Sequence, residues 1–236
     1  MADARLPGPQ SPTSAGLGLA AEPFAQRASP PGPTGTGTDN VDVPGVFVAP
    51  RRPSAPPSAP PRKTPEGEAR GMTASEISMA RTLFGDSVVY GRVKVHNEEY
   101  LPFGLQPDDT AMTPNGEMYF NPKRFKEDFS LSDFSDAHWF MHEMVHVWQY
   151  QLGYPVMLRG AIRIGLGYEY TLQANKRLRD YNMEAQGDLL SDYWAVSQFT
   201  NPKVLWQEKH RHDLALFRQV LQDFIAAPSN KRNLPS

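Results

Sequence analysis

Residues 142–151 read His-Glu-Met-Val-His-Val-Trp-Gln-Tyr-Gln, and they lie inside a segment with helical periodicity. In this segment, which runs from Ser135 to Leu152, the large apolar residues Phe140, Met144 and Trp148 recur every four positions. Apolar residues at that spacing share one face of a helix and indicate that the face is buried. The sequence therefore predicts a helix over residues 135–152 that packs against the core of the protein.

The first five residues of this stretch form an H-E-x-x-H sequence. Side chains at positions i and i+4 project from one face of a helix, so His142 and His146 can bind the same zinc ion. Glu143 points about 100° round the helix from His142, where it can contact a metal-held water without binding the metal. Two buried histidines without a partner would be unfavourable. The pattern predicts a zinc site with His142 and His146 as ligands and Glu143 as general base.

The third ligand has to come from another segment, because a catalytic zinc site usually has three protein ligands and one open position for water. Our candidate is Glu184 in Asn182-Met-Glu-Ala-Gln-Gly-Asp188, within a second predicted helix. Asp188 lies on the same face, where it can accept a hydrogen bond from a ligand histidine. Gly187 would allow the two helices to approach closely. Two alternatives stay open: Asp188 or Asp192 is the ligand, or Glu184 and Asp188 are solvated acids.

Four other polar residues are candidates for structural or substrate-binding roles. His138 lies about 12 Å along the helix axis from His146, too far for both to share one ion, so we expect a structural role. Tyr168, Tyr181 and His210 are candidates for contacting the substrate or the oxyanion that forms during hydrolysis. For His210, a solvated surface position is the alternative.

The remaining predicted elements combine helices with a small sheet, which gives the α+β class. Thr73 and Glu76 form a capping box that opens a helix. Residues 154–175 are read as strand or loop. The other expected elements are a strand over Ser87–His96, an Asn115-Gly116 turn, a strand over Glu117–Phe120, a helix over Asn182–Phe199 and a helix over Asp213–Ala226.

Composition divides the chain at about residue 70. Residues 1–70 hold 15 of the 23 prolines and 8 of the 18 glycines, and their only aromatic residues are Phe24 and Phe47. A segment with so few apolar side chains cannot bury enough surface to offset its conformational entropy. We therefore expect a disordered Pro/Gly-rich tail over residues 1–70 and a folded domain over residues 71–236.

The totals exclude several classes of protein. The net charge of −2 does not provide the basic surface of a nucleic-acid-binding protein. The chain has no cysteine, so disulfides and thiolate chemistry are excluded. No apolar run approaches the roughly 18 residues of a membrane span, and the N-terminus lacks the apolar region of a secretory signal. We expect synthesis in the cytoplasm and, if the protein is exported, export by a specialised secretion system.

Three segments together resemble a known family. Residues 142–151, Asn115-Gly-Glu-Met-Tyr-Phe120 and Asn182–Asp188 are similar to the metallopeptidase domain at the C-terminus of some VgrG-type spike proteins of bacterial type VI secretion, and to free-standing relatives. The resemblance covers about residues 83–195. It implies a zincin-like fold in which the strand Glu117–Phe120 forms the sheet edge that aligns an extended peptide. The E-x-x-x-D element resembles the gluzincin pattern, which supports Glu184 as ligand and Asp188 as its partner.

These observations favour a zinc-dependent peptidase that acts on a protein or peptide. The resemblance implies a secreted bacterial effector, with the secretion machinery or an immunity protein as partner. One alternative keeps the site and changes the substrate to the peptide cross-links of the cell wall. Another is a non-catalytic adaptor in which zinc is structural, although a closed structural site has no use for a base at Glu143.

Overall fold

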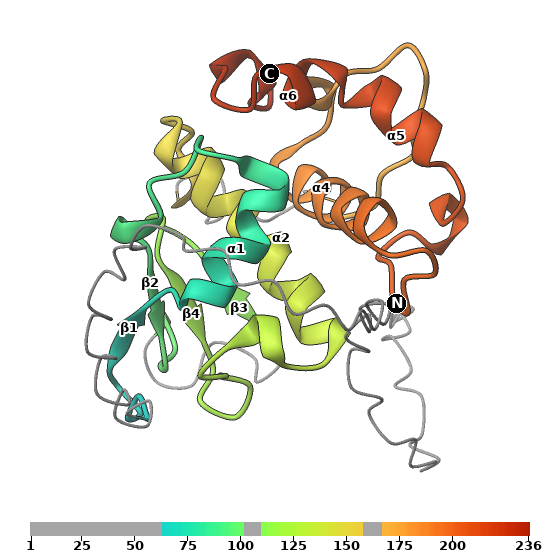
Figure 1. Cartoon of the computed structure of the whole chain (residues 1–236). Helices are drawn as coiled ribbons and strands as arrows, with labels where there is room; N and C mark the ends of the chain where they lie inside the picture. The colour runs from blue at the N-terminus through green and yellow to red at the C-terminus, as the bar shows by residue number, and fades with distance from the viewer. Residues whose placement is uncertain (1–62, 102–109, 158–166) are drawn as a thin grey trace, which may run out of the picture. The chain divides into compact units, whose positions relative to one another are not determined.

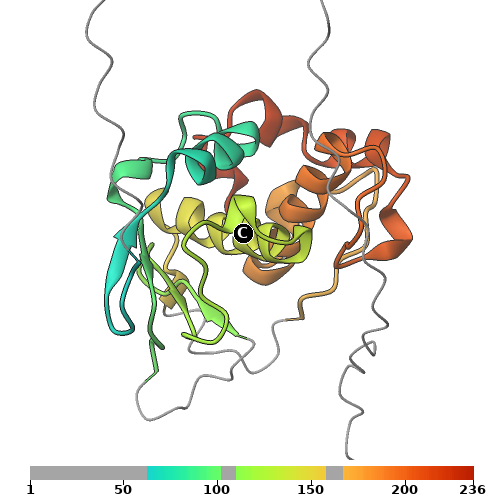
Figure 2. The same cartoon turned by 60° about the horizontal axis from the view of Figure 1, so that its bottom comes forward.

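The computed structural model describes residues 63–101, 110–157 and 167–236. The predicted tail therefore lies outside the described residues, except for Lys63 to Arg70. Two long helices dominate the described part, and a small sheet of short strands lies on one side of them (Figures 1 and 2). The prediction of an α+β fold, mostly helical with a small sheet, is confirmed.

The two long helices are α2 (Phe134–Gln151) and α4 (Met183–Gln198), which pack against each other. Each end of both helices lies one residue from its predicted position. The α2 side chains Phe140, Met144 and Trp148 are fully buried, as their spacing predicted. Asn182 caps α4, because its side chain accepts a hydrogen bond from the backbone N–H of Ala185 at 2.9 Å. Burial of these apolar faces fixes the two helices side by side.

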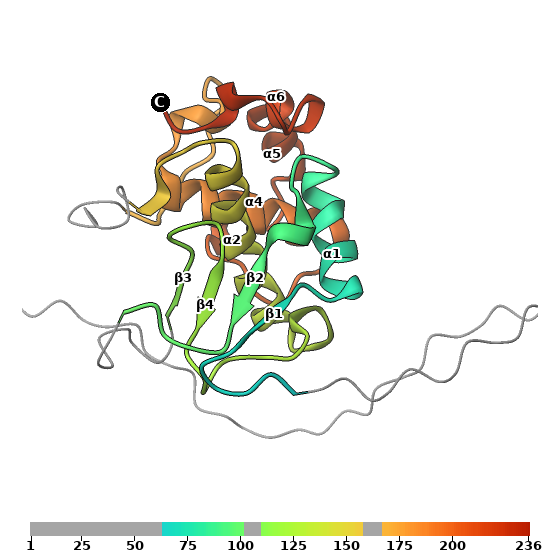
Figure 3. The same cartoon turned by 90° about the vertical axis from the view of Figure 1, so that its left-hand side faces the viewer.

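The sheet has four described strands in the order β1-β2-β4-β3, which can be followed in Figure 3. Antiparallel pairing joins β1 to β2 and β3 to β4, whereas β2 and β4 are parallel. The hairpin between β3 and β4 turns at Gly116, whose φ of 80° suits glycine. The strand bounds are Ala69–Gly71 for β1, Lys94–His96 for β2, Ala111–Met112 for β3 and Met118–Phe120 for β4.

The predicted strand over Ser87–His96 is wrong for most of its length. Only β2 is extended, and Tyr90–Arg92 forms a turn of 3-10 helix, η1. That turn breaks the alternation on which the prediction depended: Val89 is 53% exposed, while Tyr90 is buried. The valines that follow the turn, Val93 and Val95, are both buried as expected.

The predicted sheet edge is also wrong. β4, the strand within Glu117–Phe120, has β2 on one side and β3 on the other. Among the described strands, the edges are β1 and β3. β3 could not be predicted, because two residues are too few to show an alternating pattern. The strand at the sheet edge beside β4 is therefore β3, which consists of Ala111 and Met112.

The predicted domain boundary at Gly71 falls inside β1. Arg70 in this strand forms an ion pair of 2.7 Å with the fully buried Glu76 of α1 (Ala74–Phe84). Thr73 caps α1 through the predicted capping box with Glu76. Residues before Gly71 thus contribute to the sheet and to its contact with α1.

The C-terminal region contains two short helices where one was predicted. They are α5 (Leu214–Val220) and α6 (Gln222–Ala226), separated at Leu221. Short 3-10 turns complete the described structure: η3 (Phe129–Leu131), η4 (Leu178–Asp180), η5 (Glu208–His210) and η6 (Lys231–Asn233). Residues 167–175 form a loop, and residues 158–166 of the ambiguous segment lie outside the described residues. Within the described ranges, none of the helices is both long and apolar enough to cross a bilayer.

Candidate functional site

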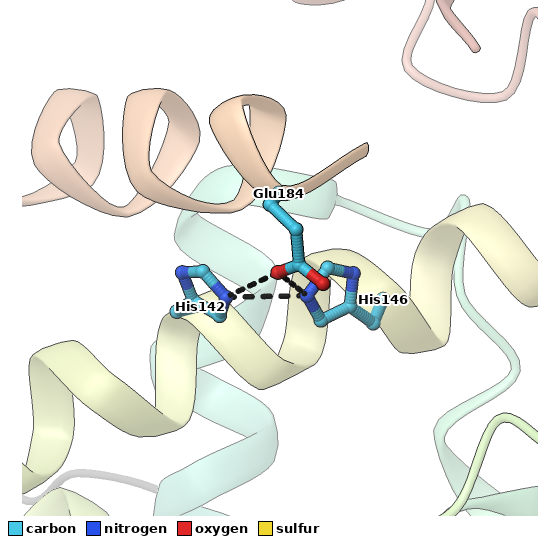
Figure 4. A group of neighbouring side chains, drawn as sticks. All are labelled: His142, His146 and Glu184. Atoms are coloured by element: carbon cyan, nitrogen blue, oxygen red, sulfur yellow. Dashed lines mark hydrogen bonds and ion pairs between the residues drawn. The ribbon is translucent and has the colours of Figure 1, made fainter. Parts of the chain in front are cut away.

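Helices α2 and α4 bring three predicted site residues together. His142 Nε2 and His146 Nε2 lie 3.2 Å apart, and Glu184 Oε2 lies 3.6 Å from the first and 3.2 Å from the second (Figure 4). All three side chains are buried, with residue exposures of 5%, 5% and 3%. Within the described part of the chain, these are the residues whose nitrogen and oxygen atoms could together hold a metal ion.

The spacing of the three ligand atoms fits zinc. A tetrahedral ion with ligands at about 2.0–2.1 Å separates its ligand atoms by about 3.3 Å. The observed separations are 3.2, 3.2 and 3.6 Å. Two imidazoles and one carboxylate are also a donor set found in catalytic zinc sites. Three protein ligands leave the fourth tetrahedral position for water or substrate.

The Nδ1 atom of each histidine, which points away from the cluster, faces a polar side chain that can orient the ring. His142 Nδ1 lies 2.9 Å from Asp188 Oδ1, and His146 Nδ1 lies 2.9 Å from Gln149 Oε1. With hydrogen on each Nδ1, both Nε2 lone pairs face the metal position. The Gln149 amide in turn donates to the backbone carbonyl of Met183 at 3.2 Å. Sequence reasoning missed Gln149, although its i+3 spacing from His146 could have indicated it.

Gly187 allows α4 to approach the ring of His142, as its position in the sequence suggested. A Cβ atom at residue 187 would lie 2.6 Å from Cε1 of His142 and 2.8 Å from its Nδ1. Contacts below 3.0 Å require a shift of the neighbouring atoms. Because His142 is held by Asp188, any larger side chain at residue 187 would displace a predicted ligand.

The electrostatics of the cluster suit a cation. Burial lowers the pKa of His142, but Asp188 and Glu184 outweigh it and raise that pKa to about 10. Burial also lowers the pKa of His146, but the neighbouring Glu184 outweighs this effect, so the pKa of His146 is raised. The pKa of Glu184 is lowered, since the two imidazoles outweigh the opposing effect of burial. The carboxylates therefore favour positive charge between them, which protons supply in the metal-free state and a divalent ion can supply instead.

Glu143 lies beside this cluster without belonging to it. It is 5% exposed, and its Oε2 accepts a hydrogen bond of 2.6 Å from the hydroxyl of Thr113. Thr113 directly follows β3, so the hairpin places this hydroxyl against α2. No local sequence signal identified Thr113, because the contact joins residues 30 positions apart.

Asp192, an alternative third ligand in the sequence, contacts other groups. Its Oδ1 lies 2.9 Å from Nε2 of His138 and accepts a hydrogen bond from the backbone N–H of Trp206. Its Oδ2 accepts from the hydroxyl of Tyr170. His138 is fully buried in this pair and lies one helical turn before His142. Asp188, the other alternative, contacts the outer nitrogen of His142.

The three candidates for substrate or oxyanion contacts differ in their surroundings. Tyr168 is 45% exposed, and the centroid of its ring lies 6.3 Å from that of His142. The hydroxyl of Tyr181 donates to the backbone carbonyl of Thr171 at 3.0 Å. His210 is buried: its Nδ1 lies 2.7 Å from Asp213, and its Nε2 accepts from a backbone N–H. The solvated position considered for His210 is therefore wrong, and Tyr168 is the candidate that reaches the cluster.

Comparison with known proteins gives one relationship in sequence and in structure. No family model matches the chain. A segment of 138 residues, 55% of the chain, is 42% identical to the type VI secretion system spike protein VgrG2b of Pseudomonas aeruginosa and covers 13% of that protein. The solved structure of the effector domain of Pseudomonas aeruginosa VgrG2b matches with a TM-score of 0.54 at 35% identity. That match covers 69% of this chain and 86% of the domain.

Proposed function

The chain belongs to the family of the VgrG2b effector domain, and on that premise we propose that it is a zinc-dependent peptidase of the zincin-like class. One observation carries the proposal. His142, His146 and Glu184 place three ligand atoms at the separations of a tetrahedral zinc ion, and the carboxylate of Glu143 lies beside them outside the ligand set. An adaptor with a purely structural metal would not need that fourth group.

The proposed reaction is hydrolysis of an amide. When bound, zinc lowers the pKa of a water molecule and polarises the scissile carbonyl. Glu143 accepts a proton from water as the water oxygen bonds to the carbonyl carbon. It then delivers that proton to the departing amine as the C–N bond breaks. Thr113 holds one carboxylate oxygen of Glu143, which leaves the other oxygen to exchange the proton.

We propose that the substrate is a protein or peptide. An extended peptide can add to a sheet edge through its backbone hydrogen bonds. β3 offers such an edge, and Thr113 immediately after it contacts Glu143. A peptide along β3 would therefore pass close to the general base. The peptide cross-links of the cell wall remain the second candidate substrate for the same site.

We further propose that the protein is an exported effector. The matched protein is described as a spike protein of the type VI secretion system, and the matched domain as its effector domain. That relationship supports a component of the secretion machinery as the proposed partner of this chain, and an immunity protein is the alternative partner.

A proteome-wide cleavage profile tests the proposed function. Bacterial extracts treated with wild-type protein and with Glu143→Ala are compared for new peptide termini. The proposal predicts termini that appear only with the wild type. New termini from isolated cell-wall peptides alone would favour the second substrate. If both proteins bind zinc and capture the same partner but neither cleaves any peptide, the result would indicate a non-catalytic adaptor and contradict the proposed peptidase.

A further inference from the structure

A buried pair next to the candidate site takes no part in the proposed reaction. His138 and Asp192 are both fully buried, and His138 Nε2 lies 2.9 Å from Asp192 Oδ1. Removing two such groups from water is unfavourable, and interactions with neighbouring groups have to offset that cost. Asp192 also accepts hydrogen bonds from another segment of the chain, and these bonds show which segment the pair holds in place.

Asp192 anchors the loop that follows α4. Its Oδ1 accepts from the backbone N–H of Trp206 at 2.8 Å, and its Oδ2 accepts from the backbone N–H of Gln207 at 2.9 Å. The indole Nε1–H of Trp206 donates to Ser191 Oγ at 3.1 Å. One face of the indole stacks on His138, with centroids 5.3 Å apart. The backbone, the ring nitrogen and one ring face of Trp206 are all held in place.

This anchoring places an exposed aromatic ring against a predicted metal ligand. Trp206 is 42% exposed, and its ring centroid lies 5.9 Å from that of His142. Tyr168 is similarly exposed and also lies against His142. Ligand sites commonly combine apolar and aromatic walls with a few polar groups that fix orientation. A ring held rigidly, as that of Trp206 is, binds a partner with little loss of conformational entropy.

We propose that Trp206 and Tyr168 form a subsite for an apolar side chain of the substrate, next to the scissile bond. The preferred substrates then carry an aromatic or large aliphatic residue at that position. This inference rests on the proposed function, because it needs a peptide whose carbonyl lies at the metal. Covering the two rings removes apolar surface from water, which favours an apolar side chain over none by roughly tenfold in affinity.

Binding of two zinc-directed probes tests the subsite without turnover. The full chain, loaded with zinc, is titrated by calorimetry with phenylalanine hydroxamate and with glycine hydroxamate. Both probes share the metal-binding group and differ only in the side chain. We expect wild type to bind the phenylalanine probe roughly tenfold more tightly. Trp206→Ala and Tyr168→Ala should each lose most of that ratio.

Ile225→Ala is the matched control, since Ile225 is an exposed apolar residue of α6 at 46% exposure. This variant should keep the wild-type ratio. Measured zinc content and a cooperative melting transition show that a variant is folded and holds its metal. Equal affinities of zinc-loaded wild type for the two probes, or an unchanged ratio in both aromatic variants, would overturn the subsite alone. A chain that takes up no zinc would contradict the proposed function and the subsite together.

Discussion

The hydroxyl of Thr113 donates a hydrogen bond of 2.6 Å to Oε2 of Glu143, and both residues are 5% exposed. The bond joins the end of the edge strand β3 to helix α2. A buried carboxylate needs such a partner, because an unpaired charge away from water is unfavourable. The position of the proposed general base therefore depends on the β3–β4 hairpin as well as on its own helix.

Thr113→Val should lower kcat and leave KM nearly unchanged. Valine keeps the shape of threonine but removes the donor, and a hydrogen bond to a charged group contributes about 1.5–3 kcal/mol. A loss of roughly tenfold to a hundredfold in kcat is expected. Thr113→Ser keeps the hydroxyl and should retain most of the activity. The kcat and KM of each variant are measured by steady-state kinetics on a cleavable peptide. Equal kcat values for the valine and serine variants would show that the hydroxyl of Thr113 does not position Glu143.

Gly187→Ala should weaken zinc binding without lowering helix stability. The added Cβ would lie 2.6 Å from the ring of His142 and displace it, whereas alanine favours a helix over glycine by about 1 kcal/mol. Gly91→Ala is the control, because a Cβ there meets no atom within 4 Å. Zinc affinity can be measured by competition with a chromophoric chelator. Unchanged zinc affinity in Gly187→Ala would show that the two helices are not in close contact at His142.

Glu184→Ala should lose zinc, and Asp192→Asn should retain it. Glu184 supplies one of the three clustered ligand atoms, while Asp192 contacts His138 and the Trp206 loop. The zinc affinity of Asp188→Asn should lie between those of the other two variants. We expect it to be roughly tenfold to a hundredfold weaker than in the wild type, since Asp188 only orients His142. Metal analysis of the three purified variants checks this order. Full zinc occupancy in Glu184→Ala, together with loss of zinc in Asp192→Asn, would show that Asp192 and not Glu184 is the third ligand.

Zinc affinity should rise with pH well beyond the usual titration of histidine. The pKa of His142 in the metal-free fold is raised to about 10, so zinc must displace a proton at any lower pH. Protonation of His142 also stabilises the metal-free fold, because its pKa rises from 6.5 to about 10 on folding. This stabilisation is fully present below pH 6.5 and is lost as the pH rises through about 10. Competition titrations at several pH values between 6 and 9 test the first effect. An affinity that is constant above pH 7.5 would indicate an unperturbed His142.

The parts of the site that could be predicted from sequence are those encoded locally. His142, Glu143 and His146 share one helix, and Glu184 and Asp188 share another, so helical spacing alone places each set on one face. Gly187 could be predicted for the same reason. The pairing of the two helices could also be predicted, because the histidine pair needs a third ligand from another segment. The contacts of Thr113 and Trp206 could not, since these residues reach the site through a hairpin and a loop that leave no periodic signal. The misplaced sheet edge has the same origin, because the two residues of β3 are recognisable only through their pairing with β4.

Peptide hydrolysis by wild type and by Glu143→Ala, at equal measured zinc content, tests the central claim most directly. Glu143 contacts Thr113 and contributes no atom to the ligand cluster, so its loss should leave the zinc content nearly unchanged. General-base catalysis typically contributes 10²–10⁴ in rate. We predict that the wild type cleaves peptides and that the zinc-loaded variant is slower by at least roughly a hundredfold. Cleavage by Glu143→Ala at the wild-type rate would contradict the account.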